Sequence, residues 1–298
     1  MSAITTPGTF GAVSLGRRNG RSFSRIFAYA VLGLGGIMML MPFLWLVSSS
    51  LKPPQEIFVI PPQLLPQNPR WQNYVEVTTG RPFFQYVANT LTITVPAVIG
   101  QVLSTALAAY GFARLRFPGR NFVFGCVLAT LMLPQAVTLV PIYMTFRWLG
   151  WTGTFLPLIV PYWLATGAGG AFDVFLLRQF FLSIPIELED AALLDGAGYW
   201  TIFTRIILPL SRPALIVVAI LSFLFHWNDF IGPLIFLTDN RMWTLAQGVI
   251  SLRGFISGRD TTHLMMAMAT LMVLPIVAIF FVAQRAFIQG IVLTGLKG

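Results

Sequence analysis

The chain has 298 residues, of which 56% are hydrophobic and 10% charged, and its mean hydropathy is +0.77. A soluble domain carries about 25% charged residues, so this composition excludes an ordinary soluble protein and indicates an integral membrane protein. The net charge of +9 does not indicate nucleic-acid binding, because the arginines lie scattered at the ends of apolar runs. The single cysteine, Cys126, excludes an intramolecular disulfide.

The N-terminal part of the chain is predicted to be a tail followed by one membrane span. Residues 1–25 are polar and contain four arginines, and we expect a disordered, basic, cytoplasmic tail. The apolar run Ile26–Leu51 is longer than the apolar core of a signal peptide. It exceeds the ~20 helical residues that cross a bilayer. A proline-rich external loop completes the segment 26–82, and its prolines favour an extended path.

Five further apolar runs bring the predicted number of transmembrane helices to six: Phe83–Ala113, Asn121–Phe146, Phe155–Leu177, Pro213–Leu237 and His263–Ala283. Lipid tolerates only helices and closed barrels, and these runs lack the alternation of barrel strands. We therefore predict an all-α membrane protein, with residues 83–290 as the transmembrane domain and 291–298 as a C-terminal cytoplasmic tail. Loops on the side of the termini hold 12 Lys and Arg residues, against 7 on the other side, which places both termini in the cytoplasm.

A polar loop, residues 183–213, separates the fourth and fifth predicted spans. Pro185 suits the first turn of a helix, and the acids that follow suit the positive end of its dipole. Gly196 tolerates the positive φ that ends a helix. A second amphipathic helix follows, with an apolar stripe of Tyr199, Ile202, Phe203 and Ile206. Because helices that lie on lipid are usually basic, this acidic helix-turn-helix is predicted to bind a protein.

The spacing of this loop is similar to that of the EAA loop in permease subunits of binding-protein-dependent ABC importers: Asp190-Ala191-Ala192, three residues, Gly196, nine residues, Ile206, one residue, Leu208-Pro209. Asp190 stands where Glu is usual and keeps the charge. Other parts of the chain resemble carbohydrate-importer permeases of the MalG type: Ser49-Ser50-Leu51-Lys52-Pro53, Asn73-Tyr74, Asn89-Thr90, Trp227-Asn228-Asp229-Phe230 and Gly295-Leu296-Lys297-Gly298.

The resemblance implies a MetI-like permease fold and a subunit that moves a sugar or oligosaccharide across the cytoplasmic membrane by alternating access. It implies a second homologous permease, two ATPase subunits that bind ATP and Mg, and an extracytoplasmic solute-binding protein, with no cofactor on this chain. The helix-turn-helix would be the coupling element that docks on an ATPase. The implied docking residues are Glu187, Glu189, Asp190, Ala191, Ala192, Asp195, Gly196 and Ala197.

Charges inside a membrane cost roughly 2.5–3.5 kcal/mol at a helix centre, so the two acids in the predicted spans need partners or a function. Asp173 precedes Arg178 by five residues, and an ion pair between them is predicted. The second acid, Asp229, follows the aromatic side chain of Trp227 and the amide of Asn228. This combination suits binding of a sugar ring but also suits helix packing. The candidates for the substrate pathway are Asn89, Gln135, Trp227, Asn228 and Asp229.

Other classes of protein receive less support from the sequence. The chain lacks a glycine-rich loop that ends in Gly-Lys-Ser/Thr, so ATP hydrolysis is expected on another subunit. We predict no catalytic residues, because a membrane-embedded enzyme would need clustered acids or histidines, and no metal site, because His226 and His263 lack ligand spacing. Glycerol 3-phosphate is an alternative cargo, although no Arg or Lys interrupts a predicted span. A gated channel would leave the helix-turn-helix unexplained.

Overall fold

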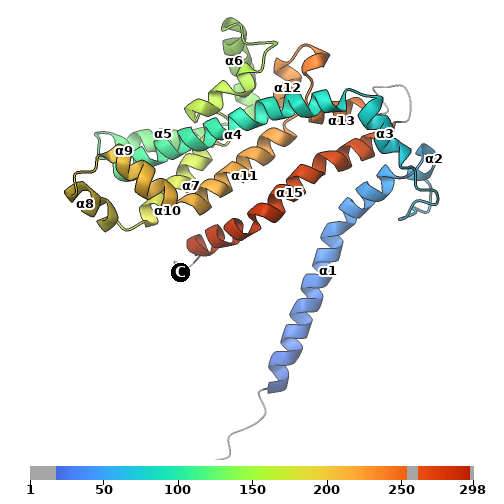
Figure 1. Cartoon of the computed structure of the whole chain (residues 1–298), viewed down its shortest axis with the longest axis horizontal. Helices are drawn as coiled ribbons and strands as arrows, with labels where there is room; N and C mark the ends of the chain where they lie inside the picture. The colour runs from blue at the N-terminus through green and yellow to red at the C-terminus, as the bar shows by residue number, and fades with distance from the viewer. Residues whose placement is uncertain (1–17, 254–260, 296–298) are drawn as a thin grey trace, which may run out of the picture.

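A computed structural model of the chain describes residues 18–253 and 261–295, and this part is all-helical (Figure 1). In chain order, the elements are α1 Arg18–Ser50, α2 Pro54–Ile57, α3 Gln72–Thr79, α4 Phe83–Arg114, α5 Arg120–Thr130, α6 Gln135–Trp148, η2 Leu156–Leu158, η3 Val160–Leu164, α7 Gly170–Ser183, α8 Glu187–Leu194, α9 Tyr199–Ile202, the π-helical η4 Phe203–Ile207, α10 Leu208–Leu210, α11 Arg212–Asn228, α12 Ile231–Phe236, η5 Asn240–Met242, α13 Leu245–Ser251 and α15 Thr262–Gly295.

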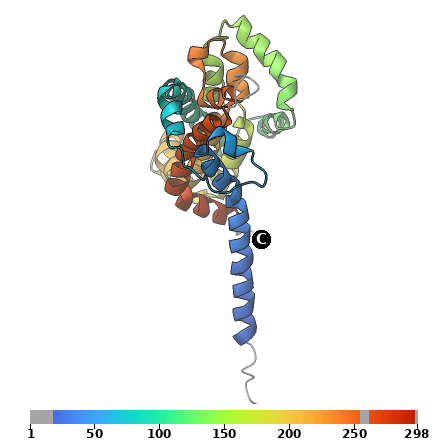
Figure 2. The same ribbon diagram turned by 90° about the vertical axis from the view of Figure 1, so that its right-hand side faces the viewer.

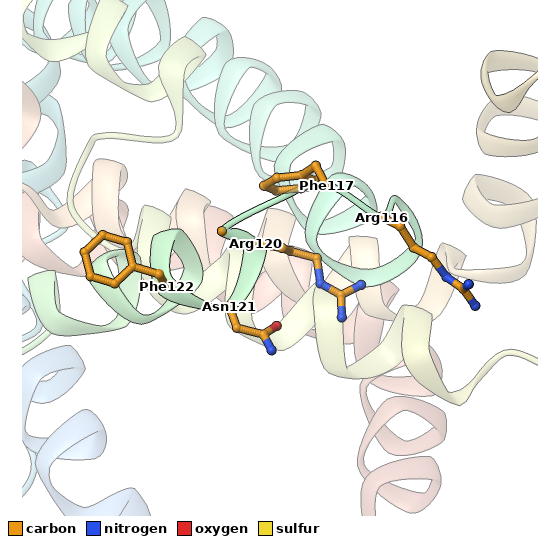
Figure 3. Close-up of a pocket in the computed structure, with 6 residues that line it drawn as sticks. Arg116, Phe117, Arg120, Asn121 and Phe122 are labelled. Carbon is orange, nitrogen blue, oxygen red and sulfur yellow. The ribbon is translucent and has the colours of Figure 1, made fainter.

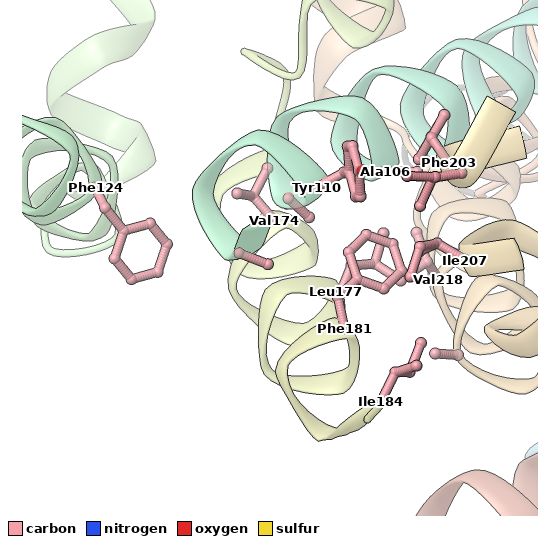
Figure 4. Close-up of a cluster of buried hydrophobic side chains, with 14 residues drawn as sticks. Ala106, Tyr110, Phe124, Val174, Leu177, Phe181, Ile184, Phe203, Ile207 and Val218 are labelled. Atoms are coloured by element: carbon pink, nitrogen blue, oxygen red, sulfur yellow. The ribbon is translucent and has the colours of Figure 1, made fainter. Parts of the chain in front are cut away.

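Helix α4 is the centre of the bundle and packs against α7, α11 and η3, while α15 packs against α11 and α1. The largest buried cluster lies where α4, α7, η4 and α11 meet (Figure 4). In this cluster α4 contributes small residues, Ala106, Ala109 and Ala113, and α7 contributes the fully buried Leu177 and Phe181. Small residues let helix backbones approach closely, which is how helices associate in lipid.

Helix α1 stands away from the bundle for most of its length, as Figures 1 and 2 both show. No residue in its most apolar stretch is buried, and the side chains of Leu32, Met38 and Met39 are at least 70% exposed. It begins at Arg18, earlier than the predicted start at Ile26, and residues 1–17 of the predicted tail lie outside the described residues. An apolar helix whose side chains are this exposed requires lipid or another hydrophobic surface around it.

Three of the described helices are long and apolar enough to cross a membrane: Phe27–Ser50, Phe83–Arg114 and Thr262–Gln284. Two helix pairs reach the required length only across a sharp bend, of 101° between α5 and α6 and of 78° between the α9–α10 segment and α11. Length and composition therefore account for at most five spans in the described residues, and the predicted count of six is not confirmed.

The predicted span Phe155–Leu177 is where the structure departs most from the sequence prediction. Two short 3-10 helices and a turn replace its first half, and a regular helix begins only at Gly170. Pro157 and Pro161 lie at the starts of the 3-10 helices, where each lacks an N–H for a longer helix. A Cβ at Gly170 would collide with the carbonyl of Ala165. The two prolines interrupt the helix, and the missing side chain of Gly170 allows the turn that brings it against Ala165. The apolar run is therefore not a continuous helix.

Two predicted helix ends also differ from the structure. Helix α11 ends at Asn228, so the last part of the predicted span Pro213–Leu237 forms the separate helix α12. Helix α15 continues to Gly295, which makes most of the predicted 291–298 tail helical, and residues 296–298 lie outside the described part of the chain.

Candidate functional site: the helix-turn-helix after α7

The predicted helix-turn-helix is confirmed as a local structure. Helix α8 ends in a glycine turn: Gly196 has φ of +82°, its N–H donates to the carbonyl of Leu193, and the N–H of Ala197 donates to that of Ala192. These two bonds form a Schellman motif, which satisfies carbonyls that a helix end otherwise leaves unpaired. The acids Glu187, Glu189 and Asp190 lie in the first turn of α8, where the helix dipole favours negative charge.

The outer surface of this hairpin is both apolar and acidic. Leu194 at the end of α8 is 90% exposed and Trp200 in α9 is 67% exposed. Glu187, Asp190 and Asp195 are also exposed. Figure 1 places α8 at the end of the molecule opposite to α3 and α13. Exposed large apolar residues beside charges are typical of a protein-binding surface.

Glu189 differs from the other acids of α8 because it is buried and points into the protein. Its carboxylate is 2.7 Å from Nε of Arg114, and the two side chains are 5% and 7% exposed. Burial raises the pKa of the Glu189 carboxyl, and the Arg114 guanidinium opposes this rise. The sequence predicts Glu189 as a docking residue on the outer surface, and its burial removes it from that surface.

The second half of the hairpin runs from Tyr199 to Leu210 as α9, a π-helical turn and α10. Ile202, Phe203 and Ile207 are buried, so this segment is held against the bundle. Tyr199 is predicted in the same apolar stripe but is 56% exposed, at the first position of α9. The π-helical turn lies further along the chain and adds one residue to the spacing, so Ile207 is buried where Ile206 is predicted.

The loop between α4 and α5 lies at the same end of α4 as Arg114 and carries positive charge. It surrounds a shallow pocket of about 320 Å³ lined by Arg116, Phe117, Gly119, Arg120, Asn121 and Phe122 (Figure 3). Figure 3 shows the guanidinium groups of Arg116 and Arg120 on one side of this loop. The predicted cytoplasmic position of the loop rests on these same arginines.

The structure does not gather the five predicted pathway residues into one cluster of contacts. Asn89 on α4 donates to the carbonyls of Arg241 and Trp243, at 2.8 and 2.9 Å, and so holds the segment before α13. Gln135, at the start of α6, is exposed. These two residues lie on different helices, α4 and α6.

The side chains of Trp227, Asn228 and Asp229 each have a different hydrogen-bond partner. Trp227 is buried, and its indole N–H donates to the carbonyl of Met272 at 3.0 Å. Asp229 accepts from the N–H of Gly232 at 3.0 Å, at the start of α12. Asn228 is exposed, and its amide donates to the carbonyl of Leu224 one turn back. Of this stretch, Asn228 presents an exposed amide at the end of α11.

The predicted ion pair between Asp173 and Arg178 does not form. Asp173 is buried and accepts a hydrogen bond from Gln101 on α4. Arg178 donates from Nε to the carbonyl of Phe112 at 3.2 Å, with its guanidinium 4.3 Å from the centre of the Phe124 ring. Five residues along a helix turn a side chain to another face, so each residue meets a different neighbour.

Two structural roles are not predicted by the sequence patterns. Arg114 contributes only its charge to the prediction, although an Arg directly after a predicted span can reach a neighbouring loop. The Ser49–Pro53 and Asn73-Tyr74 motifs carry no predicted role, and they meet in the structure. Lys52 is fully buried over the ring of Trp45, and Asn73 donates to the carbonyls of Ser50 and Lys52 at 2.8 and 3.0 Å. This contact closes the loop between α1 and α3 onto the end of α1.

Within the described residues, no group of three or more His, Cys, Asp or Glu side chains has an arrangement that could hold a metal ion.

Comparison with known proteins shows a clear family match. The family described as binding-protein-dependent transport system inner membrane component matches residues 101–292. The chain is 34% identical over 265 residues to the diacetylchitobiose uptake system permease protein NgcG of Streptomyces coelicolor, covering 89% of this chain and 86% of that protein. It is 30% identical over 276 residues to the galactooligosaccharides transport system permease protein GanQ of Bacillus subtilis, covering 92% and 95%.

A relative with another named cargo matches to a similar degree. The sn-glycerol-3-phosphate transport system permease protein UgpE of Yersinia enterocolitica is 30% identical over 274 residues, covering 90% of this chain and 95% of that protein. Among solved structures, a bacterial ABC transporter involved in the import of the acidic polysaccharide alginate has a chain with a TM-score of 0.76, 22% identity and coverage of 92% of this chain and 100% of that chain. That similarity concerns the fold.

Proposed function

This chain belongs to the family of binding-protein-dependent transport system inner membrane components, and on this basis we propose that it is the permease subunit of an ABC importer for a sugar or an oligosaccharide. The observation that carries the proposal is the helix-turn-helix, because its exposed surface lies on a bundle with the fold of an importer permease. A membrane enzyme or a channel does not require such a surface.

In this proposal the hairpin docks on a cytoplasmic ATPase subunit that binds ATP and Mg and performs the hydrolysis. The surface offers exposed Leu194 and Trp200 for apolar contact, and exposed Asp190 and Glu187 for a basic partner surface. Partly buried Ala192 and the tight turn at Gly196 support the angle between the two short helices. The other members of the docking surface are Ala191, Asp195 and Ala197.

The proposed complex also contains a second, homologous permease, a second ATPase and an extracytoplasmic solute-binding protein. The apolar surfaces of α1 and α6 support a second membrane subunit, since no residue of α6 and none in the most apolar stretch of α1 is buried within this chain. A solved relative in this fold class was crystallised with an alginate pentasaccharide-bound periplasmic protein, at a TM-score of 0.58 and 16% identity. We propose that both termini and the hairpin lie in the cytoplasm, as the distribution of Lys and Arg indicates.

The cargo is proposed to be a carbohydrate because NgcG and GanQ are named for oligosaccharides. Of the predicted pathway residues, exposed Asn228 and Gln135 are proposed to face the pathway, whereas Trp227, Asn89 and Asp229 hold helices together. Glycerol 3-phosphate is the alternative, because UgpE matches over a similar share of the chain.

The proposal is tested by deleting the gene in the source organism and measuring uptake of labelled diacetylchitobiose, galactooligosaccharides and glycerol 3-phosphate. Loss of uptake of an oligosaccharide, restored by the wild-type gene, is the expected result. Loss of glycerol 3-phosphate uptake alone would select the alternative cargo. Unchanged uptake of every carbohydrate tested in a wider panel, together with no ATPase bound to the tagged chain, would contradict the proposal.

A further inference from the structure

Arg114 joins three segments at the base of the hairpin. It is the last residue of α4, and its Nη2 donates to the carbonyls of Phe181 and Ile184 at 2.6 and 2.5 Å. These carbonyls belong to the end of α7 and the residue after it, where a helix leaves acceptors without a regular helical partner. The Phe181 carbonyl also accepts from the backbone N–H of Ile184. Its Nε makes the ion pair with Glu189 on α8. One guanidinium therefore connects α4, the end of α7 and α8.

Few other contacts determine the direction of α8. Only three residues, 184–186, separate it from α7, and Ile184 is extended, with ψ of 132°. Glu189 is the one buried residue of this eight-residue helix, and Ala192 adds a partly buried methyl group. A helix of this length is not stable in isolation, so its orientation depends on what it is attached to.

The desolvation of both charges offsets the attraction within this ion pair. Burial raises the pKa of Glu189 even with Arg114 beside it, so the charged carboxylate is less favourable in the folded protein than in water. Buried ion pairs commonly fail to repay their desolvation, and some define one conformation among several. The Nε–H of Arg114 is also not aligned for a hydrogen bond with the carboxylate, which leaves ionic attraction as the contact.

We infer that Arg114 and Glu189 are positioning residues that hold α8 at one angle to α4 and α7, so that movement of the docked ATPase is passed to the bundle. This inference rests on the proposed docking of the hairpin. With the pair broken, α8 can change its angle between residues 184–186 and the turn at Gly196 while the ATPase remains bound and active. ATP is then hydrolysed with less solute moved.

The angle can be measured directly on the full-length chain in lipid nanodiscs. Cys126 on α5 is exposed and is the single cysteine, and Leu194→Cys supplies a second spin-label site at the exposed end of α8. Double electron–electron resonance spectroscopy should give one narrow distribution of distances between the two spin labels. Glu189→Gln and Arg114→Gln should broaden this distribution. Arg114→Lys keeps the charge, so its distribution should be narrower than that of Arg114→Gln.

Arg116→Gln is the matched control, because Arg116 is exposed and lies two residues from Arg114. It should leave the distance distribution unchanged. An unchanged distribution in Glu189→Gln would overturn the inference. Broadening in Glu189→Gln with an unchanged melting temperature would support positioning, whereas a lowered melting temperature with the original width would assign the pair to stability and overturn it.

The reconstituted importer separates this inference from the proposed function. Glu189→Gln should keep ATP hydrolysis, while solute moved per ATP falls about five-fold or more, the range of coupling between sites in proteins. If hairpin surface variants such as Leu194→Asp leave ATPase binding and uptake normal, the docking proposal fails. If those surface variants abolish ATPase binding while Glu189→Gln moves as much solute per ATP as the wild type, only the positioning inference fails.

Discussion

The side-chain amide of Gln101 on α4 donates a hydrogen bond of 2.7 Å to the carboxylate of Asp173 on α7, and both side chains are buried. The bond crosses the interface between the two helices that form the centre of the bundle. It gives the acid the partner that a buried carboxylate needs.

Gln101→Leu should lower the melting temperature of the detergent-purified chain, because it leaves Asp173 buried without a donor, at a cost of about 1–3 kcal/mol. The double variant Gln101→Leu with Asp173→Leu should recover much of the loss, since both polar groups are then removed. Gln72→Leu, at an exposed position of α3, is the control. Equal melting temperatures for the single and double variants would contradict a specific pair.

Gly196→Val should abolish coupled uptake while the protein still inserts into the membrane. The φ of +82° is strained for a residue with a Cβ, by about 1–2 kcal/mol, and more for a β-branched one. A Cβ at this position would meet nothing within 4 Å, so the effect comes from the backbone alone.

Gly198→Val provides the matched control for this turn. Gly198 has φ of −78°, and a Cβ added there would also meet nothing within 4 Å, so valine fits at this position without strain. Uptake by the two variants is compared at equal membrane expression. Normal uptake in Gly196→Val, or equal loss in both variants, would count against the role of the turn.

Asn73→Ala should destabilise the loop between α1 and α3, because it removes both hydrogen bonds to the carbonyls of Ser50 and Lys52. The expected cost is about 1–3 kcal/mol, since these buried acceptors lose their donor. The melting temperature measures the change, and exposed Asn68→Ala in the same loop is the control. A matching melting temperature for Asn73→Ala and Asn68→Ala would show that the contact does not stabilise the fold.

Trp227→Phe and Asn228→Ala should separate packing from transport at the end of α11. Trp227→Phe removes the bond to the Met272 carbonyl and should lower the melting temperature. Asn228→Ala removes an exposed amide with one bond within its own helix, so the melting temperature should stay the same while the uptake rate or affinity changes. Unchanged uptake in Asn228→Ala would remove Asn228 from the pathway.

The sequence alone was sufficient for the class of the protein and for its most local feature. Low charge and long apolar runs specify a membrane bundle because lipid restricts the backbone to a few solutions. The turn at Gly196 could be predicted because the residues that make it are adjacent in the chain, and the spacing from Asp190 to Pro209 is specific enough to indicate the family.

Only the tertiary structure decided which residues meet across helices. Glu189 turns inward to Arg114, which is 75 positions earlier in the chain, and Asp173 pairs with Gln101 in place of nearby Arg178. The run Phe155–Leu177 is apolar enough to span the membrane, but its prolines and the close approach at Gly170 break it. Sequence patterns report what a segment prefers by itself, whereas these partners depend on the angle and register at which distant helices pack.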